Sequence, residues 1–133
     1  MGRRMLRCFE EMQAAGHAPL LILGSDSPAL SLASLVLWTE LLARSPALLG
    51  PAEDGGYYAI GCRAPHPLMF RGVEWSSPHT RAQTEATLIR CGLSPAYLPM
   101  SYDVDTPEDL ARLASETTLP PNTAEWLRRH YKE

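Results

Sequence analysis

Apolar residues near the start of the chain recur at helical spacing and then give way to an unbroken apolar run. Within residues 3–15 the apolar positions lie three and four apart: Met5, Leu6, Phe9 and Met12. This spacing predicts a helix, which Gly16 is suited to end. Residues 19–24, PLLILG, are apolar between a proline and a glycine, so we expect a strand buried on both faces.

The middle of the chain predicts a second helix followed by two strands. Ser31 is a helix cap, and four positions then form the expected inner face: Leu35, Val36, Leu41 and Leu42. Residues 47–51 form a short apolar segment typical of a strand. An Asp-Gly turn separates it from residues 57–61, which we expect to form a strand antiparallel to a neighbour.

Helix signals dominate the last third of the chain. Ser77 and Pro78 predict a helix that begins there and ends near Gly92. Residues 94–100 predict a short strand, and Thr106 caps another helix. A terminal amphipathic helix carries Trp126, Leu127 and Tyr131. Strands that alternate with helices predict a single α/β domain, with a mostly parallel, mixed sheet and flanking helices.

Composition narrows the function classes. The 133 residues include 12 Lys and Arg against 15 Asp and Glu, and the resulting net charge of −3 without a basic run argues against nucleic-acid binding. The longest apolar run is too short for a membrane span. Three widely separated cysteines, Cys8, Cys62 and Cys91, favour buried reduced thiols over a zinc knuckle or a disulfide framework. We therefore expect a cytoplasmic protein.

An acidic residue follows the first predicted strand directly, in the segment GSDSP. Asp26 lies at the strand end, the edge of an α/β sheet where ligands bind. Its carboxylate could hold Mg²⁺ or Mn²⁺, which prefer oxygen ligands. It could equally cap a turn, as Asp before Ser-Pro often does. This motif alone leaves the two interpretations balanced.

A second acidic motif, AEDGGYYAIG, spans residues 52–61. Glu53 and Asp54 could accept hydrogen bonds from sugar or alcohol hydroxyls, and the two following glycines allow backbone to approach a ligand. A plain hairpin turn explains the same residues. Tyr57 and Tyr58 fit one core and one surface position better than a binding platform.

A third motif, DVDTPEDL, covers residues 103–110. Helix capping accounts for Thr106, Pro107 and Glu108 but requires neither Asp103 nor Asp105. Two like charges so close together repel each other unless a cation, hydrogen-bond donors or full solvent exposure compensates them. A divalent ion shared with Asp26 would provide that compensation.

In this order the three motifs resemble the bacterial selenodomain-associated transferase 1 group, which is also domain-of-unknown-function family 2064. The family pattern is a strand ending in Gly-Ser-Asp-Cys-Pro, with Ser27 here in place of the cysteine. It continues with Gly-Pro-x-x-Asp-Gly-Gly-Tyr-Tyr at residues 50–58 and a tryptophan before hydroxyl residues at 75–77. It closes with the DVDTPEDL segment, and the match covers roughly residues 3–115.

The resemblance implies a glycosyltransferase-A-like fold related to nucleotide-diphospho-sugar transferases. It makes Asp26 the metal-binding acid, with Asp105 as the preferred second ligand and Asp103 behind it, for Mg²⁺ or Mn²⁺. Glu53 and Asp54 would be the catalytic acids that orient an acceptor. The implied substrate-binding residues are Gly55, Gly56, Tyr57, Trp75 and Ser76.

One departure from the family pattern keeps several functions open. The family begins with a strand and a glycine-rich basic loop for nucleotide phosphates, and we expect a partial domain that lacks them. The strand at 19–24 would then have an open edge, which favours homo-oligomer formation. The expected function is a metal-dependent nucleotide-sugar glycosyltransferase or nucleotidyltransferase. The alternatives are an inactive oligomerising or ligand-binding module, and a fragment whose other half is a separate chain.

Overall fold

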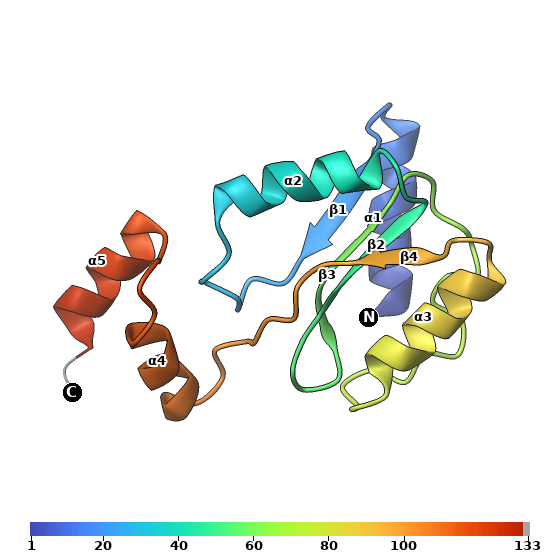
Figure 1. Cartoon of the computed structure of the whole chain (residues 1–133). Helices are drawn as coiled ribbons and strands as arrows, with labels where there is room; N and C mark the ends of the chain where they lie inside the picture. The colour runs from blue at the N-terminus through green and yellow to red at the C-terminus, as the bar shows by residue number, and fades with distance from the viewer. Residues whose placement is uncertain (132–133) are drawn as a thin grey trace.

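The computed structural model describes residues 1–131, which form helices and strands in alternation (Figure 1). In chain order these elements are α1 (Gly2–Ala14), β1 (Leu20–Leu23), α2 (Leu32–Leu42), β2 (Ala47–Pro51), β3 (Tyr57–Cys62), α3 (Thr80–Arg90), β4 (Pro95–Tyr97), α4 (Pro107–Ala114) and α5 (Pro121–His130). The predicted elements all occur, and most of their ends differ from the prediction by one or two residues.

The strands form one mixed sheet in the order β1-β3-β2-β4. β3 pairs antiparallel with both β1 and β2, whereas β2 and β4 are parallel. β1, β2 and β4 therefore point the same way and only β3 is reversed. The predicted α/β class, the mixed sheet and the antiparallel strand at 57–61 are confirmed.

Helices cover both faces of the sheet. α2 lies across one face, where Trp38 and Leu42 pack with Leu48 and Tyr58 (Figure 1). α1 and α3 lie on the other face, where Phe9 and Leu88 bury their side chains. The sheet is therefore the middle layer of three, as expected for alternating strands and helices.

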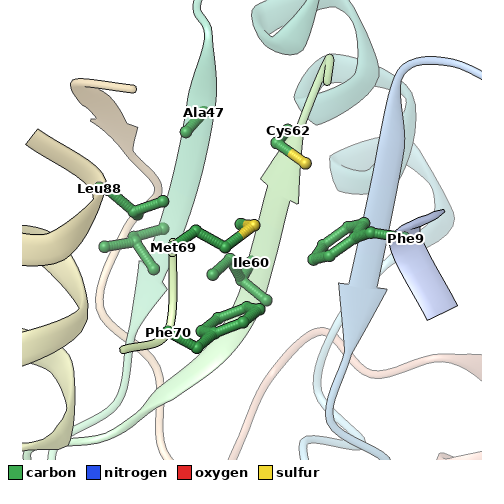
Figure 2. Close-up of a cluster of buried hydrophobic side chains, with 8 residues drawn as sticks. Phe9, Ala47, Ile60, Cys62, Met69, Phe70 and Leu88 are labelled. Atoms are coloured by element: carbon green, nitrogen blue, oxygen red, sulfur yellow. The ribbon is translucent and has the colours of Figure 1, made fainter. Parts of the chain in front are cut away.

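The core under α1 and α3 is assembled from distant parts of the chain (Figure 2). Its buried members are Phe9, Ala47, Leu49, Ile60, Cys62, Met69, Phe70 and Leu88. Met69 and Phe70 come from the long connection between β3 and α3, which the sequence did not identify as core. This connection closes the sheet face between the two helices.

Four expectations about burial and helix ends were wrong. β1 is only half-buried, and Leu23 is 36% exposed, because the strand lies at the edge of the sheet. Val36 points away from the core and is 55% exposed. α3 begins at Thr80 instead of Ser77, and Cys8 is exposed. All three cysteines are free thiols.

The chain ends, within the described residues, in two helices beside the body of the domain (Figure 1). Thr106 caps α4 as predicted and forms a capping box with Asp109. On α5, Leu127 is buried but Trp126 is 51% exposed. No helix in residues 1–131 combines the length and apolar character needed to cross a bilayer. Pairing of the open β1 edge with another chain stays a prediction.

Candidate functional site

A cavity of about 730 Å³ lies at the carboxyl end of β1, and we call it the β1 cavity. Backbone and side chains from α1, β1, β3 and the segment before α3 form its walls. Its lining residues are Met1, Met5, Ile22, Leu23, Gly24, Ser25, Asp26, Asp54, Gly56, Tyr57, Tyr58, Ala59, Ile60, Trp75, Ser76, Ser77, Pro78, Thr80 and Asp103. Three acidic residues that are far apart in sequence therefore share one cavity.

Asp103 is the most constrained of these acids. The Ser27 hydroxyl donates a hydrogen bond of 2.6 Å to its Oδ1. Burial raises the pKa of the Asp103 carboxyl, the Ser27 hydrogen bond opposes that shift, and the negative charges of Asp26, Asp54 and Asp105 raise it further. The four carboxylates thus repel one another around Asp103.

Asp26 lies beside Asp103 because a backbone hydrogen bond connects the two segments. The Val104 N–H donates a 2.9 Å hydrogen bond to the Asp26 carbonyl, so the residues after β1 run along the segment before α4. A Cβ added at Gly24 would lie 3.0 Å from Asp26 Oδ1. Glycine at 24 therefore leaves room for the Asp26 carboxylate to fold back toward the strand.

Asp105, the preferred second metal ligand, lies outside the lining of the β1 cavity. It is exposed, and its N–H donates to Asp109 Oδ2 in the capping arrangement of α4. Within the described part of the chain, no three His, Cys, Asp or Glu side chains are grouped as metal ligands. Asp26 and Asp103 are thus the predicted metal ligands that line the cavity.

The two predicted catalytic acids have separate environments. Asp54 lines the cavity, and its Oδ1 accepts a 2.8 Å hydrogen bond from the Gly56 N–H. Glu53 lies outside the lining and binds Arg112 of α4 through two hydrogen bonds of 2.8 and 2.9 Å. These hydrogen bonds hold the pKa of Glu53 below its usual value. The Arg112 guanidinium also stacks 3.8 Å from the centroid of Tyr102.

The two glycines that follow have different roles. Gly56 lines the cavity. Gly55 has a φ of +89°, and a Cβ on it would lie 2.3 Å from the Pro78 carbonyl oxygen. The Arg81 N–H also donates to the Gly55 carbonyl at 3.0 Å. Gly55 therefore fastens the acidic loop to the start of α3 and does not line the cavity.

A β-bulge decides on which face of the sheet each tyrosine lies, although both tyrosines line the cavity. Gly50 pairs with Ala59 and Pro51 with Tyr57, so Tyr58 has no partner opposite it on β2. The extra residue places Tyr58 in the core under α2, 3% exposed, and Tyr57 on the α1 and α3 face. Burial raises the pKa of Tyr57 to about 12.

Trp75 and Ser76, two of the predicted substrate-binding residues, line the cavity. The Trp75 ring lies 5.9 Å from that of Phe70, and a Cβ at Gly2 would be 2.8 Å from it. Ser76 adopts a φ of 55°, a left-handed conformation that is uncommon outside glycine. Trp75 is thus fixed against the start of α1.

Sequence reasoning missed the apolar lining of the cavity. Met5 and Ile22 were assigned to a helix face and a buried strand, although both also line the cavity. Their spacing indicates burial alone, because lining a cavity depends on how α1 approaches β1. The sequence offered one signal for this part of the cavity, the motif of a tryptophan before hydroxyl residues at 75–77.

Comparisons with known proteins identify relatives of the chain and of its fold. The family model described as "Uncharacterized protein conserved in bacteria (DUF2064)" matches residues 1–77. A crystal structure described as a "putative nucleotide-diphospho-sugar transferase" from Desulfovibrio desulfuricans G20 superposes with a TM-score of 0.86 and 29% identity. The superposition covers 97% of this chain and 58% of that protein's chain. A search of curated proteins found no match.

Proposed function

Because this chain belongs to the DUF2064 family and has a nucleotide-diphospho-sugar transferase fold, we propose that it binds a nucleotide sugar or nucleotide and an acceptor in the β1 cavity. The activity would be that of a metal-dependent glycosyltransferase or nucleotidyltransferase. One observation carries the proposal: Asp26, Asp54 and Asp103 meet in a cavity at the end of β1. Ligands of α/β proteins bind at such strand ends.

The acids of the cavity fit a divalent cation that is shared with substrate phosphates. Mg²⁺ is commonly held by one or two carboxylates together with waters and phosphate oxygens, so a group of three protein ligands is not required. Asp26 and Asp103 would hold the ion, and Asp105 stands close enough to influence Asp103 electrostatically. A bound ion would supply Lewis-acid stabilisation of the charge on the leaving phosphate.

We propose that the acceptor hydroxyl binds to Asp54 and not to Glu53. Asp54 Oδ1 is engaged by Gly56, which leaves Oδ2 for an acceptor hydroxyl. Asp54 would take the hydroxyl proton as the acceptor oxygen bonds to the transferred carbon or phosphorus. The bond from that atom to the leaving phosphate oxygen breaks, and its electron pair leaves with the phosphate. Gly56, Tyr57, Trp75 and Ser76 would bind substrate.

Glu53 would act on this site indirectly. Its two hydrogen bonds to Arg112 tie the acidic loop to α4, and the Glu53 N–H donates to the Ser101 carbonyl at 3.0 Å. The segment with Asp103 therefore stays beside the loop with Asp54. Glu53 is a positioning residue in this proposal.

Calorimetry with nucleoside diphosphates tests the proposal. We expect UDP, GDP, CDP or ADP to bind in the presence of Mg²⁺ and not in the presence of EDTA. Asp26→Asn and Asp103→Asn should each weaken that binding at least tenfold, since each removes a charged ligand of the ion. Glu40→Gln, at an exposed acid of α2 outside the cavity, is the control and should bind like the wild type. Wild-type protein that binds no nucleoside diphosphate with Mg²⁺ would refute the proposal.

A ligand-binding module without turnover is the second candidate. It is favoured by the fact that Asp54, Asp103 and Glu53 already accept hydrogen bonds from Gly56, Ser27 and Arg112. This function predicts Mg²⁺-dependent nucleotide binding without release of nucleoside diphosphate from any nucleotide sugar. Chromatography of the nucleotide products separates the two candidates.

A further inference from the structure

The β1 cavity has an acidic part and an apolar part. The acidic part lies beyond the end of β1, where Asp26, Asp54 and Asp103 interact electrostatically. The apolar part lies further back along the strands, where Ile22 pairs with Ile60. A ligand that spans both parts must therefore combine a polar end with an apolar body.

The apolar wall is anchored in the core. Met5, Ile22 and Trp75 are partly buried and pack against the core cluster that contains Phe70. They come from α1, β1 and the segment before α3, so three separate parts of the chain contribute to one apolar surface. Binding of a ligand to such a wall is favourable mainly because apolar surface of the ligand is removed from water.

Several hydroxyl groups beside this wall already form hydrogen bonds within the protein. The Thr80 hydroxyl donates to the Glu74 carbonyl at 2.8 Å, and the Ser77 hydroxyl donates to the same oxygen at 3.3 Å. The Tyr57 hydroxyl accepts from Thr84 Oγ1 at 3.5 Å. These occupied hydroxyls are less available to a ligand, so a ring that needs many hydrogen bonds is less favoured against this wall than an apolar body.

The charge of the lining also restricts the ligand. The side chains that line the cavity in residues 1–131 include three carboxylates and no lysine or arginine. An anionic acceptor would be repelled by these carboxylates. A neutral ligand can donate a hydroxyl hydrogen bond to Asp54 without such a cost.

From these observations, and resting on the proposed function, we propose that the acceptor is a neutral alcohol with an alkyl or aromatic body. Its hydroxyl binds at Asp54, and its body lies against Met5, Ile22 and Trp75. Binding should therefore strengthen as the apolar body is lengthened. Because the cavity is open, we expect each added methylene to gain about twofold in affinity, roughly half of what full burial gives.

A series of n-alkyl β-glucosides, from methyl through butyl to hexyl, tests this inference below their micellar concentrations. Each member carries the same hydroxyl groups, so a trend in Kd reports the alkyl chain alone. We expect the hexyl compound to bind wild-type protein about 30-fold more tightly than the methyl compound. Met5→Gln and Trp75→Ala should reduce that ratio to below fivefold. Trp126→Ala, at an exposed tryptophan of α5, is the matched control and should keep it.

Two results would overturn the inference: a Kd independent of chain length in wild type, or an unchanged ratio in Met5→Gln. Met5→Gln keeps a side chain of similar length at a position that is only partly buried, so it is the milder change and guards the test against misfolding of Trp75→Ala. The measurement is made without metal or nucleotide, so it does not depend on the ion or on the nucleotide. Failure of this inference is therefore distinguishable from failure of the proposed function, which loses Mg²⁺-dependent nucleotide binding instead.

Discussion

The hydroxyl of Ser27 donates a hydrogen bond to Oδ1 of Asp103, although the two residues lie 76 positions apart. Ser27 is 6% exposed, and the Asp103 side chain is half-buried. This contact joins the turn after β1 to the segment before α4. It stabilises a carboxylate that burial and neighbouring charges disfavour.

Replacing Ser27 tests how much this contact contributes to stability. Ser27→Ala leaves the Asp103 carboxylate without its donor, and we expect a loss of about 1–2 kcal/mol in the free energy of unfolding at pH 7. Urea unfolding followed by circular dichroism measures it. Ser27→Cys, which places the weaker thiol donor of the family pattern there, should lie between wild type and Ser27→Ala. An alanine variant as stable as wild type would contradict the prediction.

The raised pKa of Asp103 predicts a pH dependence of stability. Because the folded-state pKa lies above the unfolded-state value, the contribution of Asp103 is most favourable below the unfolded-state pKa. It is lost as the pH rises through the folded-state pKa. Asp103→Asn removes the charge, and because solvent screens a partly exposed carboxylate we expect a gain of only about 0.5 kcal/mol at pH 7, which shrinks toward pH 3.

Chemical unfolding of Asp103→Asn and wild type at a series of pH values checks this expectation. Asp26→Asn is a useful comparison, because it removes one of the charges that repel Asp103 while leaving the Ser27 hydrogen bond in place. An Asp103→Asn variant that is less stable than wild type at pH 7 would show that the carboxylate is favourable where it lies.

Gly55 and Gly72 both have a positive φ, so alanine substitutions at the two positions distinguish the cost of backbone strain from the cost of a steric clash. Gly55→Ala combines a left-handed conformation with a Cβ 2.3 Å from the Pro78 carbonyl oxygen, so we expect a loss of at least about 3 kcal/mol. Gly72→Ala has a similar φ, +76°, and no atom within 4 Å of the added Cβ. It should cost only about 1 kcal/mol. Thermal unfolding of both variants gives the comparison, and equal losses would rule out the Pro78 contact.

The ion pair between Glu53 and Arg112 should protect α4 from local opening. We expect Glu53→Gln to raise amide hydrogen exchange in residues 107–114 severalfold, because the variant loses the charged hydrogen bonds to Arg112. Exchange measured by mass spectrometry resolves this segment. Since the pKa of Glu53 is lowered in the folded state, protection should be present at neutral pH and lost in acid, below its folded-state pKa.

Glu10→Gln provides the control for that experiment, because Glu10 is an exposed acid of α1 that forms no ion pair within residues 1–131. Arg112→Gln should reproduce the effect of Glu53→Gln, and the double variant should add little to either. Unchanged exchange in Glu53→Gln would mean that α4 is held by packing alone.

Local sequence signals predicted the elements well, because they act over a few residues. The helix cap at Thr106, the cap at Ser31 and the apolar strand at 47–51 were all identified correctly. The start of α3 was placed too early, because Ser77 and Thr80 both bond to the Glu74 carbonyl and form a turn first. The open edge of β1 was expected only through the family resemblance and not from local patterning, since strand order depends on contacts between distant segments.

The order of apolar residues, caps and turns along the chain was sufficient to define an α/β domain. The motifs also marked five acidic residues as candidates: Asp26, Glu53, Asp54, Asp103 and Asp105. Those features follow from hydrogen bonding and burial within short segments. Only the tertiary structure decided that Asp54 enters the cavity while Glu53 pairs with Arg112, and that a bulge places Tyr57 on the face of the sheet that α1 and α3 cover. Neighbouring side chains with similar chemistry therefore have different surroundings. The register of the sheet and the docking of the helices determine those surroundings, and both depend on contacts between residues that are far apart in the chain.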